Sequence, residues 1–286
     1  MLIWMELNKE KRWISRLRGA ENGASQPGIL VRKICLAQPK MQDYNGDQKG
    51  FLNLLLMTRE AKKKMIFEHM DRIVFAGDSV TDMESAQPVG EGLFENVGKS
   101  YVRIVENMLA AFYPEVYLRV TNSGISGNTS RDLLQRFDRD VVSLKPDWVS
   151  ICIGINDVWR QFDSPAIPDE QVSPEEYRSN VEQMILSVKD NVKGIFLMTP
   201  YYMEPNAEDW MRKRMDTYGA ICGELAEKYG CRFINLQAVF NDYFQYRHSS
   251  YIAWDRIHPN QIGATVIARA FLEKCGFDYN HRPGEE

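Results

Sequence analysis

Ile73-Val74-Phe75-Ala76-Gly77-Asp78-Ser79 is the stretch that most constrains the fold of this chain. The apolar run over residues 72–76 predicts a short buried strand, and Gly-Asp-Ser follows it directly. Far downstream, the chain carries Asp255 and His258. A serine at the exit of a buried strand, with a carboxylate and an imidazole elsewhere, supplies the groups that a hydrolase with an activated serine requires.

From residue 71 onward, apolar strands alternate with helices. We expect strands near residues 72–76, 116–121, 148–153, 194–199 and 232–236. We expect helices at residues 99–112, 129–144, from 173 onward, 210–229 and 261–274. Strands that are apolar throughout and alternate with helices predict a mostly parallel, five-stranded sheet with helices on both faces, which is a three-layer α/β/α sandwich. No repeat or linker interrupts residues 71–280, so we expect one domain there.

Residues 1–70 differ in composition from the rest of the chain. They mix Lys and Arg with Gly, Asn and Gln and show no sustained hydrophobic period. We expect an N-terminal extension that is poorly ordered, or that precedes a functional start at Met57, Met65 or Met70. At the other end, residues 281–286 form a polar tail.

The composition excludes several functional classes. The 286 residues carry a net charge of -4, so the chain has no basic surplus for binding nucleic acid. No apolar run approaches the roughly 20 residues that span a bilayer, and no apolar segment with a cleavage site opens the chain. The five cysteines are scattered, which predicts reduced thiols in a cytoplasmic protein without a metal site or cofactor.

Polar residues follow the predicted strands at the points where the strands end. Ser79 follows the first strand, residues 122–127 follow the second, and residues 154–157 follow the third. Asp255 and His258 precede the last helix. Because ligands bind at the carboxyl ends of parallel strands, we expect these four loops to meet at one edge of the sheet.

His258 is the best candidate for the base that would activate Ser79. Asp255, three residues earlier, can reach one imidazole nitrogen and stabilise the imidazolium, although an Asp-x-x-His turn can also be an ordinary helix start. Pro259 stiffens the loop and disfavours helical geometry at His258. The remaining histidines lie in the N-terminal region, a polar loop and the C-terminal tail: His69, His248 and His281.

Acyl transfer also needs donors that face the developing oxyanion. Residues 122–128 offer a glycine amide in a strand-to-helix turn, Asn156 offers a side-chain amide, and Ser79 offers its own backbone amide. The alternatives are that the glycines serve only the turn and that Asn156 and Asp157 cap a helix.

Four blocks of this sequence together resemble the SGNH hydrolases, also called GDSL esterases. They are present in the family's order, over roughly residues 71–278: Gly77-Asp78-Ser79, Gly127 within residues 122–128, Gly154-Ile155-Asn156-Asp157, and Asp255-Arg256-Ile257-His258-Pro259. The resemblance implies the flavodoxin-like SGNH hydrolase fold for residues 71–280 and leaves residues 1–70 unexplained.

Carried over position by position, the resemblance implies a role for each matching residue. Ser79 would be the nucleophile, His258 the base and Asp255 the residue that orients it. Ser79 and Gly127 would donate backbone N–H groups to the oxyanion, and Asn156 would donate its side-chain amide. Asp78, which we group with the substrate-binding residues, would organise the nucleophile loop.

A narrower resemblance is to intracellular bacterial acetylxylan esterases, which remove acetyl groups from xylo-oligosaccharides and form homo-oligomers. It rests on residues 145–150, 154–160, 198–202 and 253–255. It implies a cytoplasmic, homo-oligomeric esterase that acts on acetylated oligosaccharides, with neither nucleic acid nor membrane as partner. Besides Asp78, we expect substrate contacts from side chains that could otherwise serve core packing: Trp159, Arg160, Tyr201, Tyr202 and Trp254.

Two other functions remain open on sequence grounds. A lysophospholipase or thioesterase would use the same chemistry with a long apolar groove for the acyl chain. A non-catalytic carbohydrate-binding protein could use the same fold, although the full set of serine, histidine, aspartate and oxyanion donors favours an enzyme.

Overall fold

The computed structural model describes residues 64–284 except residues 88 and 92–95. Most of the expected N-terminal extension, residues 1–63, lies outside the described residues, as does the expected start at Met57. The described residues belong to one compact unit, Lys63–Glu286.

Five strands form one parallel sheet in the order β2-β1-β3-β4-β5. The strands are β1 (Arg72–Gly77), β2 (Arg119–Gly124), β3 (Trp148–Cys152), β4 (Gly194–Met198) and β5 (Arg232–Ile234). The side chains of β3 are all buried, and those of β1, β2 and β4 are buried except at the first residue. The prediction of a five-stranded, mostly parallel sheet is confirmed.

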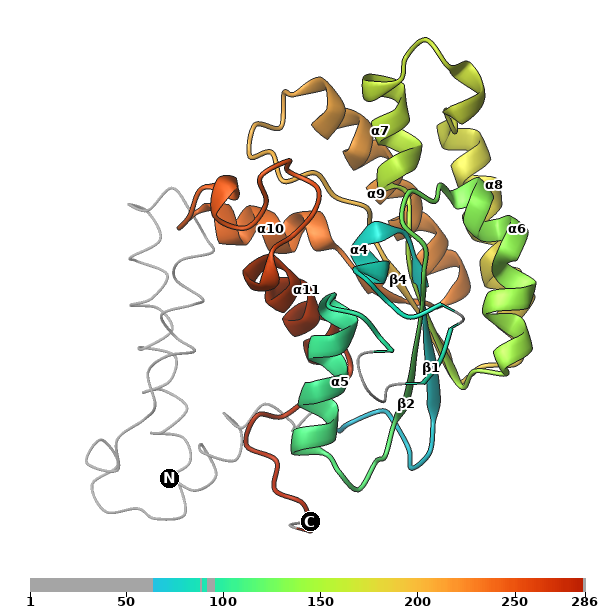
Figure 1. Ribbon diagram of the computed structural model, residues 1–286, viewed down its shortest axis with the longest axis vertical. Helices are drawn as coiled ribbons and strands as arrows, with labels where there is room; N and C mark the ends of the chain where they lie inside the picture. Colours follow the sequence, from blue (N-terminus) through green and yellow to red (C-terminus); the bar gives the residue numbers. More distant parts are fainter. Residues whose placement is uncertain (1–63, 88, 92–95, 285–286) are drawn as a thin grey trace, which may run out of the picture. The chain divides into compact units, whose positions relative to one another are not determined.

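Helices cover both faces of this sheet, as predicted. Helices α5 (Tyr101–Phe112) and α11 (Gln261–Lys274) pack together on one side, and α6 (Ser130–Asp140) and α8 (Pro174–Val188) pack together on the other (Figure 1). Helix α9 (Trp210–Tyr229) packs against α8 and against β4 and β5. Ser173 caps α8, with its Oγ accepting a hydrogen bond from the Glu176 amide, as its sequence predicts.

Three helices were not predicted from the sequence. They are α4 (Ser79–Asp82), α7 (Ile155–Asp163) and α10 (Leu236–Phe244), which are all short and start within four residues of a strand end. Helix α6 is shorter than predicted, because it ends at Asp140 and a 3-10 turn over Val142–Leu144 replaces its last turn.

The second strand lies three residues beyond its predicted start at residue 116. The amide of Val116 donates to the carbonyl of Tyr113, and Tyr117 has a left-handed φ of 48°, so the chain turns there. The observed strand instead includes the polar residues Asn122 and Ser123, both buried. Apolar patterning could not identify them, because their polar groups are paired with distant residues: Asn122 donates to the carbonyls of Thr81 and Val97, and Ser123 accepts from Arg136.

The compact unit includes residues 64–70, which precede the predicted domain start. Phe67 is buried and packs edge-on against Trp148, with 5.4 Å between ring centroids. The Ile66 amide donates to the Cys275 carbonyl, and the Trp148 Nε1–H donates to Asp71. These contacts attach the segment to both the sheet and the C-terminal helix.

The parallel register brings the strand ends level. Gly77 at the end of β1 lies beside Gly124 of β2 and Cys152 of β3, and Cys152 lies beside Met198 of β4. The loops that follow these four strands therefore leave the sheet from one edge. This is the arrangement that the sequence predicted for the polar residues after each strand.

Space at this edge is tight. A Cβ added to Gly77 would lie 2.3 Å from the Thr81 Oγ1 and 2.5 Å from the Cys152 carbonyl oxygen. A Cβ on Gly219, in the middle of α9, would meet nothing closer than 3.7 Å. The two glycines thus differ in whether a methyl group can be accommodated.

We predict that Gly77→Ala lowers the free energy of unfolding by about 1–3 kcal/mol, because the methyl group must displace backbone. The matched Gly219→Ala variant should gain about 0.5–1 kcal/mol from higher helix propensity. Urea denaturation curves would test both values. A Gly77→Ala protein as stable as the parent would contradict the close packing at this strand end.

Candidate active site

Ser79, His258 and Asp255 form a continuous hydrogen-bonded chain. The Ser79 Oγ lies 2.9 Å from the His258 Nε2, and the His258 Nδ1 lies 2.5 Å from the Asp255 Oδ2. The serine and histidine are separated by 179 residues in the sequence. The three side chains that the sequence singled out are therefore brought together, with the imidazole between the hydroxyl and the carboxylate.

Asp255 is held in its ionised form by its own loop. Its Oδ1 accepts hydrogen bonds from the amides of Ile257 and His258, at 2.9 and 2.8 Å. Partial burial opposes ionisation of Asp255, but the bonds from His258 and Ile257 outweigh it and lower its pKa. An ionised carboxylate at this position accepts a hydrogen bond from the Nδ1 of His258, which leaves the Nε2 free to accept a proton from Ser79.

The loop that carries Asp255 and His258 is anchored to the segment after β4. The Met203 amide donates to the carbonyl of Arg256, and the Tyr201 hydroxyl donates to the carbonyl of Ile257. Arg256 adopts a left-handed φ of 65° and pairs with Glu204 at 2.7 Å. These bonds fix the histidine loop against the sheet.

Asp78 places Ser79 at the start of α4. Its Oδ1 accepts a hydrogen bond from the Val80 amide and caps the helix, whereas its Oδ2 is buried and has no partner among the described residues. Burial raises the pKa of Asp78 to about 7. Because Asp78 is only 1% exposed, it organises the nucleophile turn, and we find it too deep to contact a substrate.

Three N–H groups are available near the serine. Within the described residues, the main-chain amides of Ser79 and Gly127 donate to no acceptor. The Asn156 Nδ2 donates one hydrogen to the Asn128 carbonyl at 2.9 Å, which leaves its second hydrogen available. These are the donors that the family resemblance implied, and each lies on a loop that leaves the same edge of the sheet.

Asn156 is the second residue of α7, which follows a turn at Gly154. Gly154 has a φ of 124°, and a Cβ there would lie 2.8 Å from the Tyr177 ring, so only glycine fits without displacement. The neighbouring Asp157 does not cap its own helix. Its carboxylate accepts hydrogen bonds from the amide and hydroxyl of Ser130, at the start of α6. Burial raises the pKa of Asp157 to about 6, although the bonds from Ser130 oppose the shift.

Arg136 is a site-supporting residue that the sequence analysis missed. Its guanidinium is buried and donates to the carbonyls of Gly77 and Ser123 and to the Asn128 side chain. The sequence did indicate it in one way, because Arg136 lies between Leu133 and Phe137 on the apolar face of α6. Such a charge is almost never buried without partners.

The predicted substrate-binding aromatics have different environments. Trp159 packs edge-on against the His258 ring at 5.9 Å, and the Arg160 guanidinium lies 5.2 Å above the Trp159 ring. Trp254 is 88% exposed beside Asp255, and Tyr202 is half-buried. Tyr201 is fully buried and anchors the histidine loop, so the structure places it in the core instead of at a substrate surface.

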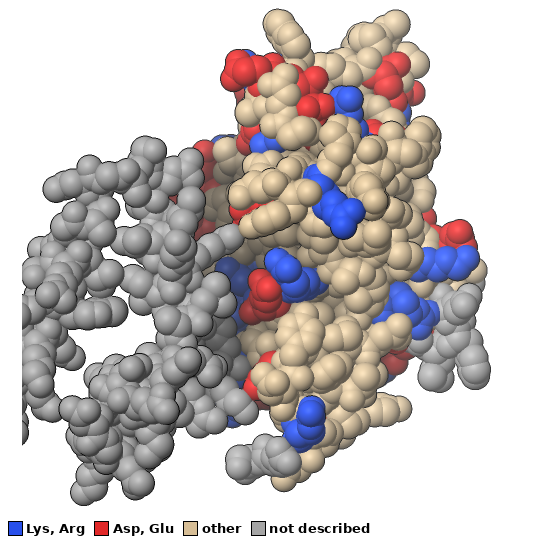
Figure 2. Space-filling model, turned by 90° about the vertical axis from the view of Figure 1, so that its left-hand side faces the viewer, with Lys and Arg blue, Asp and Glu red and all other residues tan. Residues whose placement is uncertain are grey.

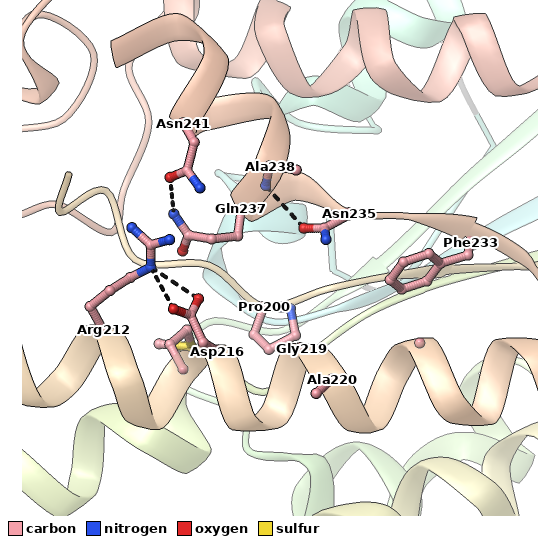
Figure 3. A pocket seen from close by; sticks show the side chains of 12 residues that line it. Pro200, Arg212, Asp216, Gly219, Ala220, Phe233, Asn235, Gln237, Ala238 and Asn241 are labelled. Atoms are coloured by element: carbon pink, nitrogen blue, oxygen red, sulfur yellow. Dashed lines mark hydrogen bonds and ion pairs between the residues drawn. The ribbon is translucent and has the colours of Figure 1, made fainter. Parts of the chain in front are cut away.

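A separate groove of about 410 Å³ lies between α9, β5 and α10 (Figure 3). Its polar side chains are already paired with one another: Arg212 with Asp216, Gln237 with Asn241, and Asn235 with the Ala238 amide. None of the predicted catalytic or oxyanion residues lines it. We therefore locate the chemistry at the Ser79 edge of the sheet and not in this groove.

Surface charge, helix hydropathy and potential metal ligands can be described for the same residues. On the face displayed in Figure 2, Lys and Arg side chains are scattered among acidic and uncharged ones and form no continuous basic patch. In the part of the chain that the structure describes, no helix is both long and apolar enough to cross a membrane. Among the same residues, no cluster of three or more potential metal-binding side chains occurs.

Known proteins are similar to this chain in fold and in sequence. The model of the GDSL-like Lipase/Acylhydrolase family matches residues 75–266. An acetylxylan esterase from Geobacillus stearothermophilus is 47% identical over 209 residues, which cover 73% of this chain and 95% of the relative. The crystal structure of Axe2, an acetylxylan esterase from that organism, matches with a TM-score of 0.74 at 46% identity, over 76% of this chain and 99% of that chain. LAE5, an alpha/beta hydrolase from the metagenome of Lake Arreo in Spain, matches with a TM-score of 0.73 at 47% identity, over 74% and 98% of the two chains.

We predict that Asp78→Asn changes how stability depends on pH. Between about pH 4 and 7, folded Asp78 holds a proton that the unfolded chain releases, so its contribution to stability falls as the pH rises toward 7. The asparagine side chain of the variant does not titrate. From pH 5 to 8, the stability of Asp78→Asn relative to the parent should therefore rise by on the order of 2 kcal/mol.

Urea midpoints at several pH values would measure this difference. Asp242→Asn, which replaces an exposed carboxylate on α10, is the control for loss of a negative charge. A difference between Asp78→Asn and the parent that stays constant over this pH range would show that Asp78 is ionised throughout.

Proposed function

The chain belongs to the GDSL-like lipase/acylhydrolase family, and from that premise we propose that it is a serine esterase that removes acetyl groups from xylo-oligosaccharides. The observation that carries the proposal is the 2.9 Å contact between the Ser79 Oγ and the His258 Nε2. The similar acetylxylan esterase supports the choice of acyl group and sugar.

The proposed reaction begins when the Ser79 Oγ attacks the acetyl carbonyl carbon and the His258 Nε2 takes the hydroxyl proton. The ionised Asp255 stabilises the resulting imidazolium through its contact with the Nδ1. The bond between the carbonyl carbon and the sugar oxygen then breaks, and His258 returns the proton to the leaving hydroxyl. Water, deprotonated by His258, attacks the acyl-enzyme; the bond from the carbonyl carbon to the Ser79 Oγ breaks, and His258 passes the proton to that oxygen, which releases acetate and free Ser79.

Negative charge develops on the carbonyl oxygen in both tetrahedral intermediates. We assign its stabilisation to the Ser79 and Gly127 amides and to the free hydrogen of the Asn156 Nδ2. Gly127 suits this role because it has a φ of 84° and a Cβ added there would meet no atom within 4 Å, so its loop side is open. Preorganised donors of this kind each contribute about 10²–10³ in rate.

We assign sugar contacts to the accessible aromatic groups around His258. Trp159 offers a ring beside the imidazole, with Arg160 stacked on it, and Trp254 offers a second exposed ring beside Asp255. Tyr202 lies on the loop that anchors the histidine segment and completes this set. Flat apolar rings suit sugar faces, and the guanidinium suits sugar hydroxyls.

A lipid-directed esterase would need a long apolar groove at the serine. The groove between α9, β5 and α10 lies away from Ser79, and paired polar side chains such as Arg212 and Asp216 interrupt its lining, which does not favour that alternative. A purely binding role is disfavoured because the serine, histidine and aspartate are aligned for proton transfer.

We also propose that the enzyme is a cytoplasmic homo-oligomer. Cys152, Cys222 and Cys275 are free and buried, which suits a reducing compartment. Trp210 is 85% exposed, and aromatic side chains are enriched at protein–protein interfaces. Recovery of the enzyme from a secreted fraction would contradict the cytoplasmic assignment.

The main experiment measures acetate released from acetylated xylo-oligosaccharides. We predict that Ser79→Ala lowers the rate by at least about 10³-fold with the fold intact, because the nucleophile is lost. Ser179→Ala, which removes an exposed hydroxyl on α8, should leave the rate unchanged.

The same assay with nitrophenyl acetate and nitrophenyl octanoate separates the two ester classes. A preference for the octanoyl ester would contradict the acetyl assignment, and substantial turnover by Ser79→Ala would contradict the assignment of the nucleophile. Tight oligosaccharide binding without acetate release would indicate a binding protein.

For the assembly, we predict a molar mass in solution of at least twice the 33.1 kDa of the chain. Light scattering coupled to gel filtration would measure it. A mass of one chain across a range of protein concentrations would contradict the oligomer.

A further inference from the structure

Arg136 joins three separate segments at the Ser79 edge of the sheet. Its Nη2 donates to the Gly77 carbonyl at 3.0 Å, and its Nη1 donates to the Ser123 carbonyl at 2.9 Å. Its Nε donates to the Asn128 Oδ1 at 2.6 Å. The side chain is only 8% exposed, so the guanidinium lies beneath the surface of the site and does not line it.

Two of these acceptors lead directly to assigned oxyanion donors, whereas the Ser123 carbonyl anchors Arg136 to β2. Gly77 ends β1, two residues before the Ser79 amide. Asn128 follows Gly127 in the chain, and its carbonyl accepts the hydrogen bond from the Asn156 Nδ2. A single guanidinium is therefore connected to all three donors. The path to Ser79 and to Gly127 is one hydrogen bond and a short stretch of chain, and the path to Asn156 passes through Asn128 and a second hydrogen bond.

We propose that Arg136 is a positioning residue that keeps the three oxyanion donors aligned with Ser79. The inference rests on the proposed function of Ser79, Gly127 and Asn156, and Arg136 itself does not touch the substrate. The planar guanidinium presents N–H groups in a fixed fork, so it can serve three acceptors in different directions at once. A lysine ammonium carries its three N–H donors on one nitrogen and cannot span the same acceptors.

The segment around residues 122–128, which carries Gly127 and Asn128, has other attachments that do not depend on Arg136. Asp82 accepts hydrogen bonds from the amide and hydroxyl of Ser126. The Asn122 side chain donates to the carbonyls of Thr81 and Val97. Because these bonds remain when Arg136 is replaced, we expect the loop to stay folded while Asn128, and with it Asn156, loses its fixed position.

A second arginine on α6, Arg139, pairs with the same carboxylate as Arg136 and provides a matched control. The Arg136 Nη1 lies 3.2 Å from the Asp140 carboxylate, which also pairs with Arg139. Arg139 is on the same helix and shares this partner, but its side chain is 75% exposed and donates to Asp140 alone among the described side chains. Replacing Arg139 therefore removes a charge from α6 and an ion pair from Asp140 without touching the oxyanion donors.

The experiment compares Arg136→Lys, Arg136→Gln and Arg139→Gln by kcat and KM for nitrophenyl acetate, with urea midpoints for each. Loss of one oxyanion donor lowers the rate about 10²–10³-fold, so misplacement should lower kcat by about 10–10²-fold in both Arg136 variants. KM should stay within about twofold, since the ground-state ester gains little from these donors. The shape of the pH–rate profile should match the parent, because Asp255 and His258 are untouched. Arg139→Gln should retain the parent kcat.

Asn128→Ala provides an independent route if Arg136→Lys does not fold. This variant removes the acceptor of the Arg136 Nε but keeps the buried charge, and it should lower kcat in the same direction. If Arg136→Lys does fold, the double variant Arg136→Lys/Asn128→Ala should lose less kcat than the two single effects multiplied together, because both substitutions break the same contact.

Three outcomes would overturn the positioning role. One is a kcat for folded Arg136→Lys within twofold of the parent, and another is a change confined to KM. The third is a loss of activity that only follows the loss of folded protein. Failure of the proposed function is distinguished by Ser79→Ala: if that variant retains turnover, the esterase assignment is wrong, whatever Arg136 does.

Discussion

The parallel register of β1 with β2 and β3 is the constraint on which the whole site depends. It sets Gly77 beside both Gly124 and Cys152, so three strands end at one level. A slip of one residue would shift a strand by about 3.3 Å and turn its side chains to the opposite face. Ser79, the 125–128 loop and Asn156 would then no longer share an edge. The close packing around Gly77 opposes such a slip, because larger residues cannot occupy its place.

Three aspartates near this edge show how environment separates their roles. Asp255 receives hydrogen bonds from two amides and an imidazole, so its pKa is lowered and it stays ionised. Asp78 is buried with one amide bond, and its pKa is raised to about 7. Asp157, on α7, is buried against the start of α6, and burial raises its pKa to about 6. Only Asp255 is placed to stabilise an imidazolium, whereas the other two hold helix starts in position.

Much of the support for the site is polar and buried. Asn122 and Ser123 lie inside β2, Arg136 lies beneath the oxyanion loop, and Ser130 joins Asp157 to Asn180. Fully paired buried polar groups make geometry specific, because each has few alternative partners in an apolar surrounding. The edge of the sheet where the chemistry is proposed is therefore more rigidly specified than apolar packing alone would achieve.

The sequence alone determined the class of the fold and the order of most of its elements. Apolar runs and capping residues act over a few residues, so strands such as β1 and β3 and helices such as α9 could be predicted close to their observed bounds. The Gly-Asp-Ser turn and the Asp255-to-His258 spacing are also local, and they indicated the groups that meet in the site. The tertiary structure alone decided the register, the burial of Tyr201, the shifted start of β2 and the partners of Arg136. These features depend on contacts between segments far apart in the chain, and a linear pattern does not encode which carbonyl a buried guanidinium will meet.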